Sequence, residues 1–336
     1  MKKGNKKQIT IKKSTIIILI VLLILLSAFA YFSTDIVQYF EIIFHQNTNL
    51  SETLTSNETL LGITDVKGQG VKIDILDGTD LIHQEDLIIM IDELKNAGAQ
   101  AIAINNQRIT NSSYIYCDGS VILLDGEKIG NPFCITAIGD SETIYGALMR
   151  NKGYISTLQN DGVQVSVEKS DNIEIQKTKN NKLLNYGNNK TKIGKIKKSN
   201  QLIGKASVKG KGVDILITEN QTRLSSLYFM QIINDLKSAG VEAISLNDNR
   251  ITNMTDFMDI SNKYILVNSV PISAPYLIKA IGNQDKIFEV INYTNSYIKK
   301  IESLGASVDI YKDSFVKIDK YVVHRGKDKM SMEYIK

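Results

Sequence analysis

The stretch that decides the fold runs from Glu93 to Thr110 and reads Glu-Leu-Lys-Asn-Ala-Gly-Ala-Gln-Ala-Ile-Ala-Ile-Asn-Asn-Gln-Arg-Ile-Thr. It returns from Asp235 to Thr252 as Asp-Leu-Lys-Ser-Ala-Gly-Val-Glu-Ala-Ile-Ser-Leu-Asn-Asp-Asn-Arg-Ile-Thr, with every position 142 residues further along. A fixed offset held over such a length indicates an internal repeat. The sequence therefore predicts one structural unit used twice.

The first copy begins with a strand and a helix. Apolar residues alternate with polar ones over 71–75, which predicts a strand with one buried face. Apolar residues then recur at helical spacing over 87–94, and Gly98 is placed to end that helix in the left-handed conformation. Residues 101–104 predict a second strand.

The rest of the copy predicts a hairpin, a helix and a final strand. Asp118-Gly119 is a turn signal between two apolar runs, and residues 133–138 read as a further strand. Ser141 is a natural N-cap for one helix that continues to Leu158, before a last strand over 163–167. This order predicts the α+β class, as two tandem ferredoxin-like domains, each a βαββαβ core with an extra hairpin.

The N-terminal region predicts a membrane anchor. Six lysines within residues 2–13 precede residues 15–32, which carry no charge and are mostly Ile and Leu. That length just suffices for a transmembrane helix, and the lysines predict a cytoplasmic N-terminus. Ala28-Phe29-Ala30 also fits a cleavage site, so a cleaved signal peptide is the alternative to a single-pass anchor. Either way, we expect the repeats to be extracytoplasmic.

A basic segment separates the two copies. Nine lysines and no acidic residue lie between Lys177 and Lys205, which is typical of a solvated flexible linker. The alternative is a basic strip that contacts anionic envelope polymer or lipid headgroups. In chain order, the predicted segments are a cytoplasmic basic tail (1–14), the transmembrane helix (15–32), a stalk (33–58), the first repeat domain (59–176), the linker (177–200), the second repeat domain (201–320) and a tail (321–336).

The composition gives no sign of nucleic-acid binding or of a metal site. The net charge of +4 is small and no aromatic platform accompanies a basic strand, so we expect no nucleic-acid partner. Cys117 and Cys134 occur only in the first copy and are expected to be buried free thiols, with a disulfide as the extracellular alternative. The three histidines show no ligand spacing with these cysteines, so no metal site is predicted.

Four polar residues remain as a candidate site: Asn105, Arg108, Asn247 and Arg250. They follow buried strands, where binding sites often form. The structural explanation is that each Asn caps its turn and each Arg pairs with a nearby carboxylate. The Gly-x-Gly pairs at 68–70 and 210–212 stand before strands instead of opening helices, so they predict no cofactor. No catalytic residue and no enzyme activity are predicted.

The motifs of the first copy together resemble the domain of unknown function 881 family, the YlxW-like bacterial proteins. The second copy resembles the family too, although it lacks Cys-x-Gly and has Asn283 where the first has Asp140. The resemblance implies a membrane-anchored bacterial protein with an extracytoplasmic α+β domain, linked to cell envelope and division, and no known activity. Two copies and a short stalk depart from the family's usual longer coiled coil. The motifs are Gly68-Gln-Gly-Val71, Glu93-Leu-x-x-Ala-Gly-Ala-x-Ala-Ile-x-Ile-Asn-x-x-Arg108, Cys117-x-Gly119 and Pro132-Phe-x-Ile-x-Ala-Ile-Gly-Asp140.

Two functions are consistent with these features. We expect an anchored extracytoplasmic interaction or scaffold protein whose partner is an envelope protein or a second copy. The alternative is a binder of small molecules or cell-wall fragments, or a cryptic enzyme, that uses the end of the sheet at Asn105 and Arg108. A scaffold predicts no deep polar cavity near these two residues, whereas a binder predicts one that also collects Asp or Tyr side chains.

Overall fold

The chain divides into two compact units, Met1–Thr53 and Leu54–Lys336, and the second unit holds both copies of the repeat. The predicted cytoplasmic tail, most of the predicted stalk and the predicted transmembrane helix other than Leu22 lie outside the described residues. None of the helices in the described part of the chain is long and apolar enough to span a bilayer. The computed structural model describes residues 22, 48–77, 81–119, 121–188, 190–220, 223–260, 264–322 and 333–334.

The first copy mixes strands and helices along the chain, so the predicted α+β class is confirmed. In chain order its elements are β1 (Val66–Leu76), α2 (Gln84–Asn96), β2 (Ala101–Ile104), β3 (Gln107–Arg108), β4 (Ile115–Asp118), β5 (Val121–Leu124), β6 (Glu127–Ile129), β7 (Phe133–Ile138), α3 (Ser141–Leu148), α4 (Tyr154–Asn160) and β8 (Gln164–Ile175).

The second copy repeats this order element by element, and a short strand near the C-terminus follows it. Its elements are β9 (Val208–Thr218), α7 (Ser226–Ser238), β10 (Ala243–Leu246), β11 (Asn249–Arg250), β12 (Phe257–Asp259), β13 (Ile265–Val267), β14 (Val270–Ile272), β15 (Tyr276–Ile281), α8 (Gln284–Ile291), α9 (Tyr297–Ser303), β16 (Ser307–Ile318) and the final β17 (Glu333–Tyr334).

Each copy forms one main antiparallel sheet. The strand orders are β8-β1-β7-β2-β3 and β16-β9-β15-β10-β11, and β17 adds to β1 of the first sheet. The order β8-β1-β7-β2, with helices on the two crossovers, agrees with the predicted βαββαβ core. The predicted hairpin around Asp118 is present as β4-β5, and β6 joins it as a third strand that the sequence analysis did not predict.

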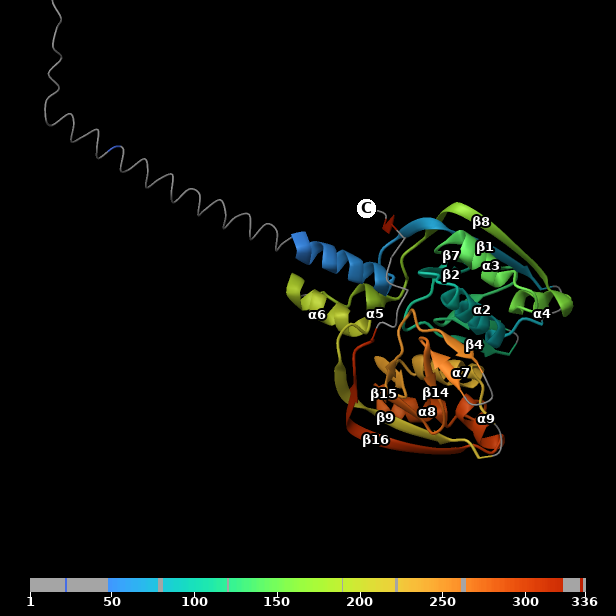
Figure 1. The fold of residues 1–336 in the computed structure, drawn as a ribbon. Helices are drawn as coiled ribbons and strands as arrows, with labels where there is room; N and C mark the ends of the chain where they lie inside the picture. Colours follow the sequence, from blue (N-terminus) through green and yellow to red (C-terminus); the bar gives the residue numbers. More distant parts are fainter. Residues whose placement is uncertain are drawn as a thin grey trace, which may run out of the picture. The chain divides into compact units, whose positions relative to one another are not determined.

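The two sheets lie on the outside of the unit and the helices α2 and α7 lie between them. Figure 1 shows β8 with β1, and β16 with β9, along opposite outer sides. The inner face of α2 buries Leu87, Met90 and Leu94 against sheet residues such as Ile73 and Ile135. Each such side chain contributes roughly 1.5–3 kcal/mol through burial. A matching cluster fills the second copy, so each copy has its own core.

The two copies dock with approximate two-fold symmetry. Asp92 of α2 accepts a hydrogen bond from the backbone N–H of Phe257 at 2.9 Å. Asn234 of α7, which is 142 residues after Asp92, accepts one from the N–H of Ile115 at 2.8 Å. Ile115 is in turn 142 residues before Phe257, so the contacts are reciprocal, as in an isologous dimer interface. The tandem repeat therefore folds as a dimer within one chain.

The Gly-x-Gly pairs permit close packing of strands. A Cβ atom at Gly70 would lie 1.9 Å from the carbonyl oxygen of Ala137, and one at Gly212 would lie 2.0 Å from that of Ala280. The pairing of β1 with β8 also shifts register between Gly68 and Gly70, which marks a β-bulge. Close strand packing and a bulge therefore account for these glycines.

The prediction of one helix from Ser141 to Leu158 is wrong, because two shorter helices, α3 and α4, occupy this range. The chain turns between them, and the N–H of Gly153 donates to the carbonyl of Arg150 at 3.0 Å. Gly153 then stands as the N-cap residue of α4. The apolar spacing across the break is close to helical, which explains why the sequence alone suggested one helix.

The segment predicted as a flexible linker is largely helical, and this corrects the prediction. It holds α5 (Asn181–Leu184) and most of α6 (Lys192–Leu202). Residues 48–61 are also helical where a flexible stalk was predicted, and α6 is their counterpart 142 residues later. Asn57 donates to Ser199 at 2.9 Å, and both side chains are fully buried. Each copy thus starts with a helix, and in α6 the many lysines concealed the buried face.

Candidate functional site

A polar cavity of about 580 Å³, hereafter the Arg108 cavity, lies where the two copies meet α5 and α6. Such a volume is typical of sites for small molecules. Asp125 is one of three acidic residues in its lining, and Tyr114 and Tyr186 also contribute. Six basic residues outnumber these acids, so the cavity favours anions: Arg108, Lys177, Lys179, Lys182, Lys198 and Lys237.

Arg108 is the most deeply buried cation of this cavity. Its side chain is only 3% exposed, and its Nε and Nη1 atoms have no hydrogen-bond partner among the described residues. Burial lowers the pKa of Arg108 to about 10, while Asp65 favours the charged form, so the guanidinium is a cation at neutral pH. The predicted ion pair with a carboxylate is not found among the described residues. A buried charge without a partner is costly, and a bound anion would offset that cost.

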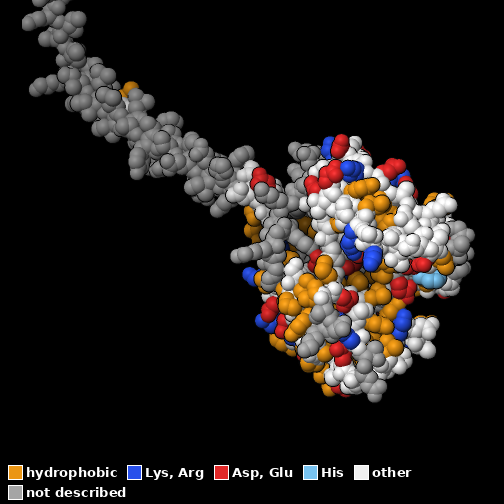
Figure 2. Space-filling view, turned by 45° about the vertical axis from the view of Figure 1, so that its right-hand side comes forward, with side chains coloured by type: hydrophobic (Ala, Val, Ile, Leu, Met, Phe, Trp, Pro, Cys, Tyr) orange, Lys and Arg blue, Asp and Glu red, His pale blue; other side chains and the backbone are white. Residues whose placement is uncertain are grey.

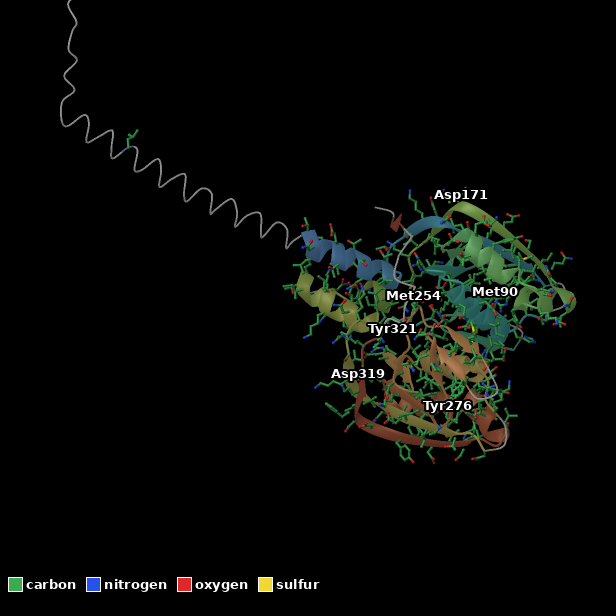
Figure 3. All side chains as sticks on the ribbon, in the orientation of Figure 1. Met90, Asp171, Met254, Tyr276, Asp319 and Tyr321 are labelled. Carbon is green, nitrogen blue, oxygen red and sulfur yellow. The ribbon has the colours of Figure 1, made fainter. Side chains whose placement is uncertain are left out.

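Arg250, the counterpart of Arg108, has a structural contact. Its Nη2 atom donates to the carbonyl of Gln201 at 3.0 Å, near the C-terminal end of α6, but its Nε and Nη1 atoms, like those of Arg108, have no partner among the described residues. Burial lowers its pKa to about 10 as well. At the second copy's counterpart of Ser112 stands Met254, which with Asn253 and Gln100 lines a small hollow that has no room for a water molecule. Figure 3 shows Met254 where the two copies meet, so the cavity breaks the two-fold symmetry.

Asn105 and Asn247 hold turns, as their structural explanation predicts. Asn105 donates to the carbonyl of Gly130 and accepts from the N–H of Cys134, both at 2.8 Å. Asn247 accepts from the N–H of Leu277 at 2.7 Å. Both residues have positive φ values, of 47° and 45°, which Asn tolerates better than most residues. Neither lines the Arg108 cavity, so of the four candidate residues only Arg108 does.

Lys237 is a cavity residue that the sequence analysis missed. Desolvation lowers the pKa of its ammonium group to about 7; Lys95 lowers it further, and Asp125 opposes the shift. Lys237 also lines a smaller, mostly apolar cavity of about 70 Å³ between α2 and α7. A signal was present in the sequence, because Lys95 and Lys237 occupy the same position in the repeated stretch.

Two carboxylates of the cavity already have protein partners. Asp125 accepts from the hydroxyl of Ser113 at 2.8 Å and from the N–H of Tyr114 at 3.1 Å. Burial also raises the pKa of Asp125. Glu242 lies 3.7 Å from the ammonium group of Lys198. Asp125 also favours the charged form of Lys237, so these two acids offset part of the positive charge of Lys237 and Lys198.

Other chemistry-bearing groups do not gather around the cavity. Cys117 and Cys134 are free thiols, as expected, but both are half-buried and not fully buried. Burial raises the pKa of each thiol. Within the described ranges, no cluster of three or more His, Cys, Asp or Glu side chains could hold a metal ion. On the face drawn in Figure 2, basic and acidic side chains are interspersed, so that face carries no general excess of positive charge.

Known proteins similar to this chain come from bacteria. The UPF0749 protein YlxW of Bacillus subtilis is 31% identical over 138 residues, which cover 38% of this chain and 60% of the relative. The UPF0749 protein Rv1825 of Mycobacterium tuberculosis is 28% identical over 126 residues, 36% of this chain and 43% of its own length. The chain thus spans about half the length of these curated relatives.

A solved structure and a family model add to this comparison. The crystal structure of an uncharacterized conserved protein from Mycobacterium tuberculosis aligns with a TM-score of 0.36 and 22% identity, over 39% of this chain and 94% of that one. The model of a bacterial protein family of unknown function, DUF881, matches residues 53–188 and again residues 195–334. The protein therefore belongs to the DUF881 family and carries its domain twice.

Proposed function

We propose that this protein binds a small anionic ligand in the Arg108 cavity without turning it over. The observation that carries the proposal is that the buried guanidinium of Arg108, whose Nε and Nη1 atoms have no partner among the described residues, lines a cavity with more basic than acidic residues, whereas Arg250, with the same two atoms unpartnered, does not. Guanidinium groups match carboxylate and phosphate oxygens in geometry and charge. The ligand is therefore expected to carry phosphate or carboxylate groups.

The cavity favours the binder over the scaffold. A cavity at Arg108 that also collects Tyr114, Asp125 and Tyr186 is the feature by which the binder hypothesis differs from the scaffold hypothesis. Binding without catalysis is proposed because Asp125 and Glu242, two nearby carboxylates, are already engaged with protein groups. The basic groups that remain can hold an anion.

We also propose that the cavity works in the cell envelope. The apolar run of residues 15–32 would anchor the chain in the cytoplasmic membrane, with the repeats on the extracytoplasmic side. An envelope partner, or self-association, remains part of this proposal. Protease treatment of spheroplasts tests the placement, because digestion of both repeats in intact spheroplasts supports it and full protection would contradict it.

Calorimetric titration tests the binding function. The probes are inorganic pyrophosphate and citrate, titrated into the purified full chain in nonionic detergent. We expect the chain to bind at least one probe and the Arg108→Met variant to lose at least tenfold in affinity. Arg250→Met is the matched control, since Arg250 is the buried counterpart outside the cavity, and it should retain affinity. If neither probe binds, or if both variants bind like the unchanged chain, the proposed function is wrong.

A further inference from the structure

We propose that the ligand is the end of a linear polyanion, a chain of phosphate groups whose further units lie along a neighbouring lysine groove. This inference rests on the proposed function, because the Arg108 cavity receives the chain end. The lysine groove is a second hollow of about 530 Å³, and its basic residues are Lys182, Lys209, Lys211 and Lys286.

The groove and the cavity adjoin. They share Lys182, Gly240 and Glu242 in their linings, so a chain that extends past these three residues reaches both hollows. The groove then runs between β9, which contributes Lys209, and the start of α8, which contributes Lys286. A ligand confined to the cavity would leave these lysines unused.

The positive charge along the groove favours a ligand that carries several negative groups in a row. Four lysines face a single acidic residue, Glu242, which already lies near Lys198. Lys209 also stands 5.0 Å above the ring of Phe315, which holds its ammonium group in place. Each exposed lysine adds little alone, but several along one bound chain act together and release counterions. The affinity should therefore rise with chain length.

Two other polyanionic ligands, a nucleic acid and a lipid bilayer, fit the groove and the cavity less well. Among the described residues, none that lines the groove has an aromatic side chain on which a nucleic-acid base could stack. A lipid headgroup in a bilayer is held near a flat surface, whereas Arg108 is only 3% exposed and requires a group that enters the cavity. A flexible phosphate chain with a free end meets both requirements.

The test compares short and long phosphate probes on the purified full chain in nonionic detergent. Inorganic pyrophosphate reports on the cavity, and long-chain linear polyphosphate reports on the cavity together with the groove. We expect polyphosphate to bind at least tenfold more tightly per chain than pyrophosphate, with a steep loss of affinity as salt is raised. The triple variant Lys209→Gln, Lys211→Gln and Lys286→Gln should lose this advantage and keep the pyrophosphate affinity.

The outcomes separate the two proposals. If pyrophosphate binds but polyphosphate gains nothing, or if the triple variant keeps the full advantage, the groove inference is overturned and the proposed function stands. If neither probe binds, both proposals fail. Arg108→Met should weaken both probes, and tight polyphosphate binding by this variant would overturn the assignment of the chain end. Glycerophosphoglycerol, a soluble lipid headgroup, should bind weakly, and an affinity equal to that of polyphosphate would assign the site to lipid instead.

Discussion

Replacing Asp92 with Asn should stabilise the protein at neutral pH. Asp92 is 9% exposed in the interface between the copies, and desolvation is the main reason why its pKa rises from 3.8 to about 8. Lys95 and the hydrogen bond from Phe257 oppose this shift, whereas Asp256 and Glu93 add to it. The second copy already has the neutral residue at this position, Asn234, which makes two hydrogen bonds to Ile115.

The sign and size of the effect follow from proton linkage. A carboxyl group with a raised pKa in the folded state binds its proton more tightly there than in the unfolded chain. The stability that Asp92 contributes is therefore greatest in acid and falls as the pH rises from about 4 to about 8. The slope for one proton is about 1.4 kcal/mol per pH unit, so between pH 5 and pH 7 the loss is about 2–3 kcal/mol.

The assay is urea unfolding followed by far-ultraviolet circular dichroism at pH 5, 6 and 7. The free energy of unfolding of Asp92→Asn should exceed that of the unchanged chain by a margin that grows by about 2–3 kcal/mol over this range. The reverse variant, Asn234→Asp, should lose stability as the pH rises. A margin that does not change with pH would show that Asp92 is ionised in the folded protein and would refute the reasoning.

Three further predictions concern packing, capping and charge. Gly70→Ala should lower the free energy of unfolding in urea by more than about 2 kcal/mol, because its Cβ would overlap the carbonyl of Ala137. Gly98→Ala should lower it by about 1–2 kcal/mol, because the site has open space but a φ of 89°. Arg250→Met should destabilise more than Arg108→Met, by about 1 kcal/mol in the same assay, because Arg250 donates to the backbone carbonyl of Gln201 and Arg108 has no such acceptor among the described residues. Pyrophosphate affinity should fall between pH 6 and pH 8 as Lys237, with a pKa of about 7, loses its proton; a Lys237→Met variant that shows the same fall would contradict this assignment.

The repeat made much of the fold predictable. The period of apolar residues identified the strands at 71–75 and 101–104 and the helix between them, since burial on one face imposes that period. Gly98 has the expected positive φ of 89°. The break between α3 and α4 was missed because the buried side chains on either side of it keep nearly helical spacing.

The candidate site could be predicted only in part. Arg108 was found because an arginine recurs at a strand end in both copies. Lys237 and the lysines of α5 and α6 were missed as cavity residues, because the docking of the two copies brings them together. Docking depends on contacts such as that of Asn234 with Ile115, which no local period reveals. The abundance of lysine also concealed the helical character of α6, whose buried face includes Ser199.

The central claim, that Arg108 receives an anion, is tested most directly by nitrogen-15 NMR of the arginine side chains. The chain has only five arginines, and the Arg108→Met variant assigns the signal of Arg108. On titration with pyrophosphate, we predict that the guanidinium signal of Arg108 shifts with saturation while that of Arg250 stays in place. Saturable binding that leaves the Arg108 signal unchanged, or that shifts Arg250 instead, would contradict the claim.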